Sequence, residues 1–327
     1  MLPNIFATAT AVAHPNIAFI KYWGNNDDSL RLPQNGSISM NLAELTTRTM
    51  VTFDSSLPRD IFDLNGIRQS GTSLERVSQH LNMIRGIRGF SAPAHILSES
   101  NFPVGAGLAS SSSAFAALTL ATVRALGIEM NEKDLTRLAR RGSGSAARSI
   151  PSGFVEWLPG SSDVDSYAVS IAPPQHWQLT DCIAIVENAH KKTGSSEGHR
   201  LARTSPLQAA RVADAGRRLG LCRNAIQNRD FGLLAQIIEL DSNLLHAIAF
   251  TSNPPIYYWL PLTLVLMREV QAWRRAGTPC AFTIDAGPNV HIICESANAS
   301  AIKDKLLSIT GVNQVLTSGV GGETVLI

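Results

Sequence analysis

The chain has 327 residues, of which 44% are hydrophobic and 17% charged, a composition typical of globular proteins and unlike that of disordered or collagenous chains. That length exceeds what a single hydrophobic core usually organises, so we expect two lobes or one large two-layer domain. The 28 basic and 26 acidic side chains leave a net charge of +2, which gives no reason to expect a nucleic-acid or membrane partner.

Strand patterns dominate the N-terminal third of the chain. Short apolar or alternating runs, separated by Gly, Asn, Asp and Pro, predict strands at 12–20, 37–42 and 48–53. From Ser73, apolar residues recur at three- and four-residue steps, which predicts a helix with Arg76 in its first turn. A strand at 94–98 and helices at 111–126 and 131–140 follow, the first of these helices ending at Gly127.

The second half of the chain begins with strands and continues with helices. Strands are expected at 153–157, 167–171 and 182–186. Helical spacing of apolar residues covers 207–228, 231–246 and 260–275. Strands at 281–285 and 290–294 are expected to pair around an Ala-Gly-Pro-Asn turn, before a last helix at 299–309 and a closing strand. The order of elements predicts an α+β fold of two lobes.

The cysteines and the apolar segments indicate a cytoplasmic protein. Four cysteines are spread over the second half of the chain with no Cys-x-x-Cys pair, so we expect free thiols. No basic segment precedes an apolar stretch near the first residue, so a secretory signal is not expected. The most apolar run, 114–123, is shorter than the roughly 18 residues of a membrane helix.

The strongest local signal is the segment 103–114, PVGAGLASSSSA. Glycines allow a backbone that turns successive N–H groups inward, and the helix that follows adds its positive dipole end. These features favour a polyphosphate site over a tight turn made of small residues for packing. The segment has no Gly-Lys-Ser/Thr ending, which argues against a P-loop NTPase, and no acid about 20 residues later, which weakens a dinucleotide site.

Three other segments carry residues suited to chemistry. The run RRGSGSAARS, 140–149, suits an anion, although a surface loop with a solvated arginine explains it equally well. Asp285, in FTIDAGPN, is either a turn former or a positioned catalytic acid, and the residues alone favour the turn. Lys21, in NIAFIKYWG, has either a tuned pKa or a stem that lies over the two aromatic rings beside it.

Taken together, these segments resemble the GHMP kinase superfamily and, within it, the mevalonate diphosphate decarboxylases. The four segments above follow in family order with 32–39, 192–198, 241–243 and 254–255. The resemblance implies a two-lobed GHMP-type α+β fold. Its N-terminal nucleotide-binding lobe, of the ribosomal-protein-S5-like β-α-β type, would span 1–185, and its ferredoxin-like C-terminal lobe would span 186–327.

The resemblance further implies an ATP- and Mg²⁺-dependent enzyme of isoprenoid biosynthesis. Such an enzyme phosphorylates the tertiary 3-hydroxyl of a 5-phosphorylated mevalonate, then releases phosphate and CO₂. Asp285 matches the family's catalytic aspartate, Arg148 the residue that grips the substrate carboxylate, and Lys21 the lysine beside the reacting groups. Homodimers are common in the family, so a homodimer is possible. The sequence does not identify the residues that would bind the metal.

The same resemblance assigns residues to substrate and nucleotide. Tyr22, Arg76, Ser143 and Ser145 would surround the 5-phosphate group. Nucleotide contacts would come from Asn101, Gly105, Ala106, Gly107, Leu108, Ala109, Ser110 and Ser111, with Ser195 and Ser196 in a segment that covers the nucleotide. A surface helix explains Arg76 almost equally well, and an exposed loop is the alternative for Ser195 and Ser196.

Two positions on the substrate side depart from the family pattern. Asn25 stands where the family has lysine, and His199 stands where it usually has methionine. Losing a charge-assisted contact costs about 1.5–3 kcal/mol, enough to change substrate preference. We therefore expect mevalonate 5-phosphate, giving isopentenyl phosphate, as the substrate. Arg76 remains, so mevalonate 5-diphosphate is the alternative.

Two functions of other classes were weighed. GHMP small-molecule kinases, which stop at phosphoryl transfer, usually carry an aspartate in the segment that here reads SGSAAR, 143–148, where this chain has no acid. A ligand-sensing relative without activity would not need Lys21, Arg148 and Asp285 together. Both functions are therefore disfavoured.

Overall fold

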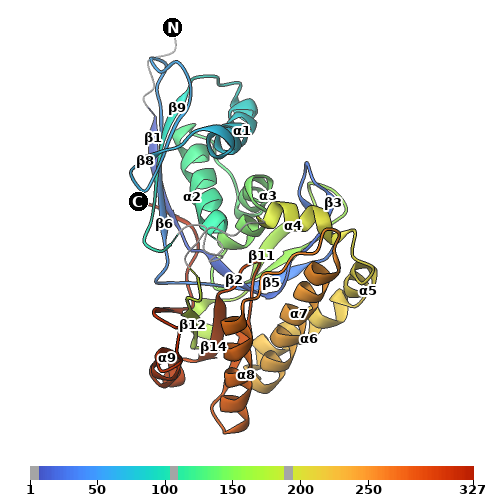
Figure 1. Ribbon diagram of the computed structural model, residues 1–327. Coiled ribbons are helices and arrows are strands. Elements are labelled where there is room, and N and C mark those ends of the chain that lie inside the picture. Colours follow the sequence, from blue (N-terminus) through green and yellow to red (C-terminus); the bar gives the residue numbers. More distant parts are fainter. Residues whose placement is uncertain (1–6, 104–109, 188–193) are drawn as a thin grey trace.

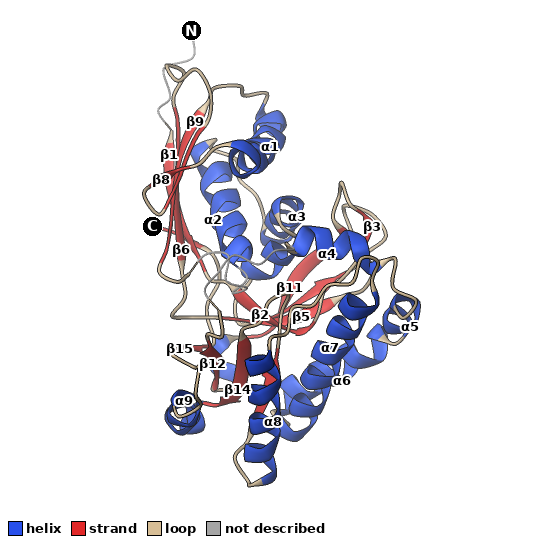
Figure 2. Ribbon diagram, in the orientation of Figure 1, coloured by secondary structure: helices blue, strands red, loops and turns tan. Residues whose placement is uncertain are grey.

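The computed structural model describes residues 7–103, 110–187 and 194–327, which form three large sheets, one small hairpin sheet and the helices packed beside them (Figures 1 and 2). The strands are β1 (Thr8–Ala13), β2 (Asn16–Ile20), β3 (Asn25–Asp27), β4 (Leu32–Pro33), β5 (Ser37–Asn41), β6 (Thr47–Phe53), β7 (Ile61–Leu64), β8 (Ile67–Arg68), β9 (Ala94–Ser100), β10 (Phe154–Leu158), β11 (Tyr167–Ala172), β12 (Leu179–Ala184), β13 (Cys280–Thr283), β14 (Val290–Glu295), β15 (Val315–Gly319) and β16 (Val325–Leu326). The α-helices are α1 (Gly71–Arg88), α2 (Ser110–Ala125), α3 (Glu132–Gly142), α4 (Ser195–Ala202), α5 (Gln208–Ala213), α6 (Ala215–Asn228), α7 (Phe231–Thr251), α8 (Pro261–Arg275) and α9 (Ala299–Leu307). Short 3₁₀ helices are η1 (Gly144–Ser149), η2 (Pro174–His176) and η3 (Ser296–Asn298).

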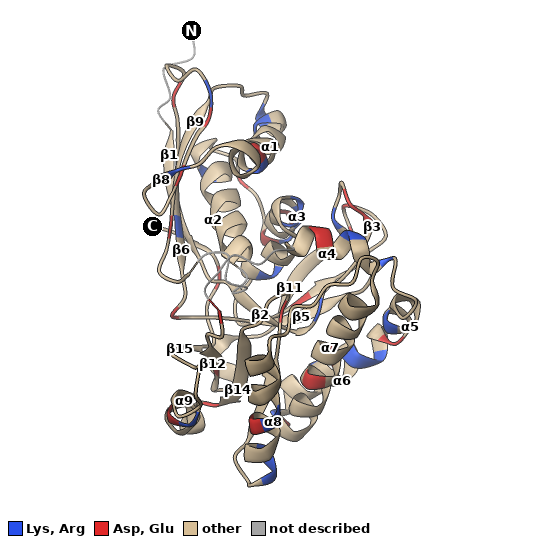
Figure 3. Cartoon of the chain, viewed as in Figure 1, with Lys and Arg blue, Asp and Glu red and all other residues tan. Residues whose placement is uncertain are grey.

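The first sheet has six strands in the order β16-β1-β6-β9-β7-β8, so the last strand of the chain pairs with the first. Helices α1, α2 and α3 lie beside this sheet (Figure 1), and α2 packs against β1 and β6. Because α2 is buried along most of its length, it carries little charge: Arg124, in its last turn, is its one Lys or Arg, whereas α3 has four (Figure 3).

Two four-stranded sheets make up the rest of the fold. The order in one is β11-β10-β5-β2, and in the other β13-β14-β12-β15. Helices α6 and α7 pack as a pair, and α7 contacts both β2 and β13. The end of β2 and the turn after β13 are therefore brought together although they are far apart in the sequence.

Most of the strands and helices expected from the sequence are confirmed, and three of them differ in where they begin or are interrupted. The run 12–20 forms two strands in different sheets, separated by His14 and Pro15, because proline cannot donate to a strand ladder. The helix expected from Ser73 begins at Gly71, and the helix expected over 207–228 is interrupted at Asp214. The division of the chain at residues 185 and 186 stays a prediction.

Helix α7 is, among the described residues, the one helix that is long and apolar enough to cross a membrane by length and composition. It lies in the core of the fold, where Leu234, Ile238 and Leu245 are almost completely buried. A buried core helix therefore accounts for its apolar composition.

A buried charge network joins α7 to the end of β2. Asp241 on α7 accepts hydrogen bonds from the Arg218 Nε at 2.7 Å and from the backbone N–H of Lys21 at 2.6 Å. The carbonyl oxygen of Lys21 accepts from Arg211 at 2.8 Å and from Asn35 at 3.0 Å. Both backbone polar groups of Lys21 are thus satisfied by side chains, which fixes the point where β2 ends.

We expect Asp241→Ala to lower the free energy of unfolding by about 3–5 kcal/mol, because it leaves the buried Arg218 guanidinium with only the partly exposed Asp214 and removes the acceptor of the Lys21 N–H. Urea denaturation measures this change. Arg217→Ala, which removes an exposed ion pair with Asp214, is the matched control and should cost less than about 1 kcal/mol. A similar small loss in both variants would contradict a structural role for the Asp241 network.

Candidate functional site

A cavity of about 510 Å³ lies where the end of β2, the hairpin β3–β4, the start of α2, η1, α4 and the turn after β13 meet. Twelve of the residues expected from the sequence line it: Lys21, Tyr22, Arg76, Ser110, Ser111, Ser143, Ser145, Arg148, Ser195, Ser196, His199 and Asp285. Segments from the whole length of the chain therefore contribute to one site.

Lys21 and Asp285 form a close ion pair in this cavity. The Lys21 Nζ donates to the Asp285 Oδ1 at 2.6 Å and to the carbonyl oxygen of Ala18 at 2.7 Å. Burial raises the pKa of Asp285, but the charges of Lys21, His291 and Arg148 and the Lys21 hydrogen bond outweigh this effect and hold the pKa below its usual value. Asp285 is therefore ionised at neutral pH and can accept a proton.

The turn that carries Asp285 is held from two sides. The backbone N–H of Ile284 donates to the Ser242 Oγ of α7 at 3.0 Å. The Thr283 Oγ1 donates to the Ala18 carbonyl at 3.2 Å, the same carbonyl that accepts from Lys21. Asp285 is thus a positioned acid, whereas the residues alone favoured a turn former.

Arg148 lies in η1 and is almost completely buried. Its guanidinium donates to the Ser37 Oγ and, at 3.2 Å, to the Asn16 Oδ1, while its Nε has no hydrogen-bond partner among the described residues. Burial lowers the pKa of Arg148 to about 10, and the nearby negative charge of Asp285 limits the fall. Arg148 therefore stays cationic at neutral pH, close enough to Asp285 for their charges to interact.

His199 packs between the two aromatic residues that follow Lys21. Its ring centroid lies 4.0 Å from that of Tyr22 and 4.7 Å from that of Trp23, and its Nδ1 accepts from the Gly24 N–H at 3.0 Å. A Cβ at Gly198 would lie 2.3 Å from the Trp23 ring, so only glycine allows α4 to approach this closely.

Asn25 has a different place from the one that the sequence suggested. It is not among the residues that line the cavity in the described structure. Its Oδ1 accepts from the Tyr22 hydroxyl, and its Nδ2 donates to the Asp28 Oδ1 at 2.7 Å. Burial raises the pKa of Tyr22, so this hydroxyl remains protonated and can keep its bond to Asn25.

Ser110 and Ser111 lie at the start of α2, between the first cavity and a second of about 410 Å³. The second cavity has apolar walls that include Phe62, Ile96 and Leu118. The expected nucleotide residues Gly105, Ala106, Gly107, Leu108 and Ala109 lie outside the described residues.

The expected nucleotide residue Asn101 is not among the described lining residues of either cavity. Its Oδ1 accepts from the backbone N–H of Thr46 at 2.9 Å, and its Nδ2 donates to the carbonyl oxygen of Glu44 at 2.9 Å. The Asn101 amide therefore holds the turn between β5 and β6.

Arg31, Arg200, Glu197 and Asn16 also line the first cavity, although sequence reasoning did not select them. The described lining contains five Lys or Arg side chains and two carboxylates, an excess of three positive charges with histidine neutral. Such an excess suits a ligand with several negative charges. The described part of the chain contains no group of three or more His, Cys, Asp or Glu that could hold a metal ion.

Replacement of Lys21 by methionine tests the electrostatics of the pair. The variant removes the main charge that lowers the pKa of Asp285 and leaves the burial that raises it, so we expect this pKa to increase. Infrared titration of the carboxylate bands, with Asp285→Asn to identify the band, measures the shift.

The matched control for this titration is Lys133→Met. Its ammonium lies over the Tyr167 ring, 4.3 Å from the centroid, and outside the lining of the cavity. An Asp285 pKa that is the same in both variants would show that Lys21 does not control the protonation of the acid.

Comparison with known proteins gives a consistent result over nearly the whole chain. The family model described as Diphosphomevalonate decarboxylase-like N-terminal domain matches residues 13–168, and the Mevalonate 5-diphosphate decarboxylase C-terminal domain model matches residues 182–324. The Diphosphomevalonate decarboxylase mvd1 of Aspergillus fumigatus is 38% identical, with 93% of this chain and 81% of that protein covered.

Solved structures agree with the family models. The mevalonate diphosphate decarboxylase from Staphylococcus aureus matches with a TM-score of 0.94 and 41% identity, covering 98% of each chain. A structure of MDDEF in complex with MVAPP, AMPPCP and magnesium has a TM-score of 0.93 and 37% identity, covering 98% of this chain and 99% of that one. The two-lobed GHMP-type fold expected from the sequence is confirmed. The chain belongs to the diphosphomevalonate decarboxylase family.

Proposed function

We propose that this enzyme is an ATP- and Mg²⁺-dependent decarboxylase that converts mevalonate 5-diphosphate into isopentenyl diphosphate, CO₂, ADP and phosphate. The observation that carries the proposal is the contact between the Lys21 Nζ and the Asp285 Oδ1, at 2.6 Å, beside the buried guanidinium of Arg148. A base kept ionised next to a buried cation suits a substrate that must lose a hydroxyl proton and a carboxylate from neighbouring carbons.

The diphosphate takes precedence here over the monophosphate expected from the sequence. Relatives that match 88–93% of this chain are named diphosphomevalonate decarboxylases, which favours the diphosphate. The excess of three positive charges in the described lining also suits a carboxylate together with a diphosphate. Arg31 and Arg200 line the cavity and supply positive charge that the lysine missing at Asn25 does not.

In this proposal Arg148 binds the substrate carboxylate and keeps it ionised and oriented, while Asp285 accepts the proton of the 3-hydroxyl. ATP supplies the phosphoryl group that turns this hydroxyl into a leaving group. The C–O bond then breaks with its electron pair going to phosphate. The pair of the bond to the carboxylate forms the alkene, and CO₂ leaves. Lys21 keeps Asp285 ionised and donates towards the reacting oxygen.

The start of α2 supports a nucleotide site. Ser110 and Ser111 lie where a helix N-terminus offers backbone N–H groups and a positive dipole end to phosphates. The adjoining cavity, with its apolar walls, suits the flat base of the nucleotide. Magnesium commonly binds through substrate phosphates and one or two carboxylates, so the described residues fit Mg²⁺ without a dedicated metal cluster.

A product assay with carboxyl-labelled substrate tests the reaction. With ATP and Mg²⁺ we expect labelled CO₂, and a higher kcat/KM for mevalonate 5-diphosphate than for mevalonate 5-phosphate. Recovery of the label in a phosphorylated acid would instead indicate a kinase. A higher kcat/KM for the monophosphate would refute the diphosphate as the preferred substrate.

Asp285→Asn should reduce kcat by about 100- to 10,000-fold while ATP still binds, because the variant removes the proton acceptor and leaves the nucleotide site intact. Turnover assays and fluorescence titration with a nucleotide analogue measure the two properties. Asp304→Asn, on the exposed face of α9, is the control and should keep full activity. Loss of nucleotide binding in Asp285→Asn would assign the residue to a different role.

Arg148→Ala should lower kcat by about 100-fold or more, because a carboxylate that is not held in place is poorly oriented for cleavage. Steady-state kinetics check this, with Arg148→Lys expected to retain part of the activity since it keeps the charge. The control is Arg124→Ala, which removes an exposed guanidinium at the end of α2. A wild-type rate in Arg148→Ala would remove this residue from the site.

A further inference from the structure

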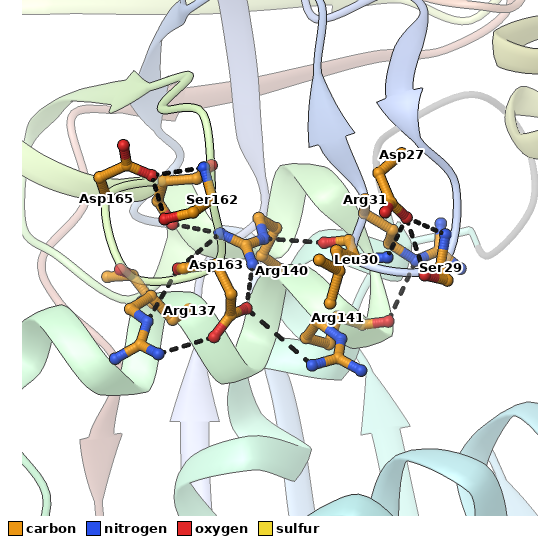
Figure 4. Close-up of polar contacts among 12 residues, drawn as sticks. Asp27, Ser29, Leu30, Arg31, Arg137, Arg140, Arg141, Ser162, Asp163 and Asp165 are labelled. Atoms are coloured by element: carbon orange, nitrogen blue, oxygen red, sulfur yellow. Dashed lines mark hydrogen bonds and ion pairs between the residues drawn. The ribbon is translucent and has the colours of Figure 1, made fainter.

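The hairpin formed by β3 and β4 carries Arg31 in an unusual backbone conformation. Arg31 has φ +50°, in the left-handed region that residues with a side chain rarely adopt. The preceding turn is folded by the Asp27 Oδ1, which accepts from the backbone N–H groups of Ser29 and Leu30, each at 2.8 Å (Figure 4). An unfavourable conformation that the surrounding contacts maintain is a reason to look for a function of this residue.

Helix α3 fixes the hairpin tip in place. The Arg140 Nε donates to the carbonyl oxygen of Leu30 at 3.0 Å, and the Arg31 Nε donates to the carbonyl oxygen of Arg141 at 3.0 Å (Figure 4). Arg140 is itself buried and paired with Asp163. The hairpin tip is therefore anchored at two points, which presents the Arg31 side chain to the cavity in a defined position.

Arg31 lines the cavity without a counter-ion among the described residues, since no described carboxylate lies within ion-pair distance of it. Another cation of the lining, Arg76, is near enough for the charge of Arg31 to act on it. Burial lowers the pKa of Arg76, and the positive charge of Arg31 lowers it further. Two partly buried cations that repel one another form a site that a bound anion stabilises.

Arg31 and Arg148 both line the cavity, and Tyr22 lies near each of them. Tyr22 is close enough to both guanidiniums for each charge to oppose the rise that burial produces in its pKa. Ser143, Ser145, Arg31 and Arg76 line the same cavity, so a substrate whose carboxylate lies at Arg148 can place its phosphate groups against them. Asn25 provides no charge there, because its side-chain amide is neutral, and this amide is already bound to Tyr22 and Asp28.

We propose that Arg31 binds the terminal phosphate of the substrate's diphosphate group and thereby sets the preference for a diphosphate over a monophosphate. This inference rests on the proposed decarboxylase function. Arg31, on the hairpin, supplies the positive charge that is absent at Asn25. The terminal phosphate relieves the repulsion between Arg31 and Arg76, and the monophosphate, which lacks that group, gains nothing from Arg31.

The test compares kcat/KM for mevalonate 5-diphosphate and mevalonate 5-phosphate in wild type, Arg31→Gln and Arg31→Lys. In Arg31→Gln we expect the diphosphate value to fall about 10- to 100-fold, mainly through KM, and the monophosphate value to change by less than about 3-fold. Arg31→Lys keeps the charge and should retain most of the preference.

Two further variants separate binding from folding and from long-range charge. Arg31→Gly removes the side chain and adopts the positive φ without strain, and the Arg140 bond to the Leu30 carbonyl remains, so it should lose the diphosphate preference with only a small fall in melting temperature. Arg141→Gln removes a neighbouring charge that lines a different cavity, and it keeps the carbonyl that binds Arg31. Arg141→Gln should leave the ratio of the two kcat/KM values unchanged.

The inference would be overturned if Arg31→Gln left the ratio of the two kcat/KM values unchanged, including by an equal loss on both substrates. It would also be overturned if Arg141→Gln changed that ratio as much as Arg31→Gln does. These results are independent of the wild-type preference, which tests the proposed function by itself. If the wild type prefers the diphosphate and Arg31→Gln has the same ratio of kcat/KM values as the wild type, the proposed function stands. Arg31 would then have no part in substrate selection.

Discussion

The site depends on one buried ion pair, between the ammonium of Lys21 and the carboxylate of Asp285, which are 264 residues apart in the chain. Burial opposes the ionised form of Asp285, and the charge of Lys21 is the largest influence that favours it. The pair forms because α7 contacts both partners: Asp241 binds the backbone of Lys21, and Ser242 binds the residue before Asp285. Two adjacent residues on one helix therefore set the distance between the reacting groups.

Much of this arrangement can be predicted from the sequence. Hydrophobic periodicity indicates most helices and strands, and the glycine- and serine-rich segment before α2 indicates a phosphate site. The catalytic role of Asp285 is not evident from periodicity, because an acid at the end of a strand usually serves the turn. It follows from the resemblance to a family, and the structure adds the contact with Lys21 that makes the role physically reasonable.

The substrate preference shows where sequence reasoning is weakest. Asn25 stands where the family has lysine, which by itself predicts one positive charge fewer in the site. The net charge of a cavity depends on every side chain that reaches it, and Arg31 reaches it from a hairpin whose direction is set by Asp27, Arg140 and α3. The contacts of Arg140 and Arg141 with the hairpin join residues about 110 positions apart, and no local pattern in the sequence reports them.

The pairing of β16 with β1 has a consequence for how ligands enter. The chain crosses from the sheet of β12–β15 back to the first sheet, where Leu326 lies opposite Ala11, and Val320 forms a bridge to Leu42. The two halves are thus connected at both ends of the chain as well as through the middle, which restricts a wide hinge opening between them. This closed set of contacts favours ligand access past surface elements that line the cavity, such as α4, over separation of the two sheets.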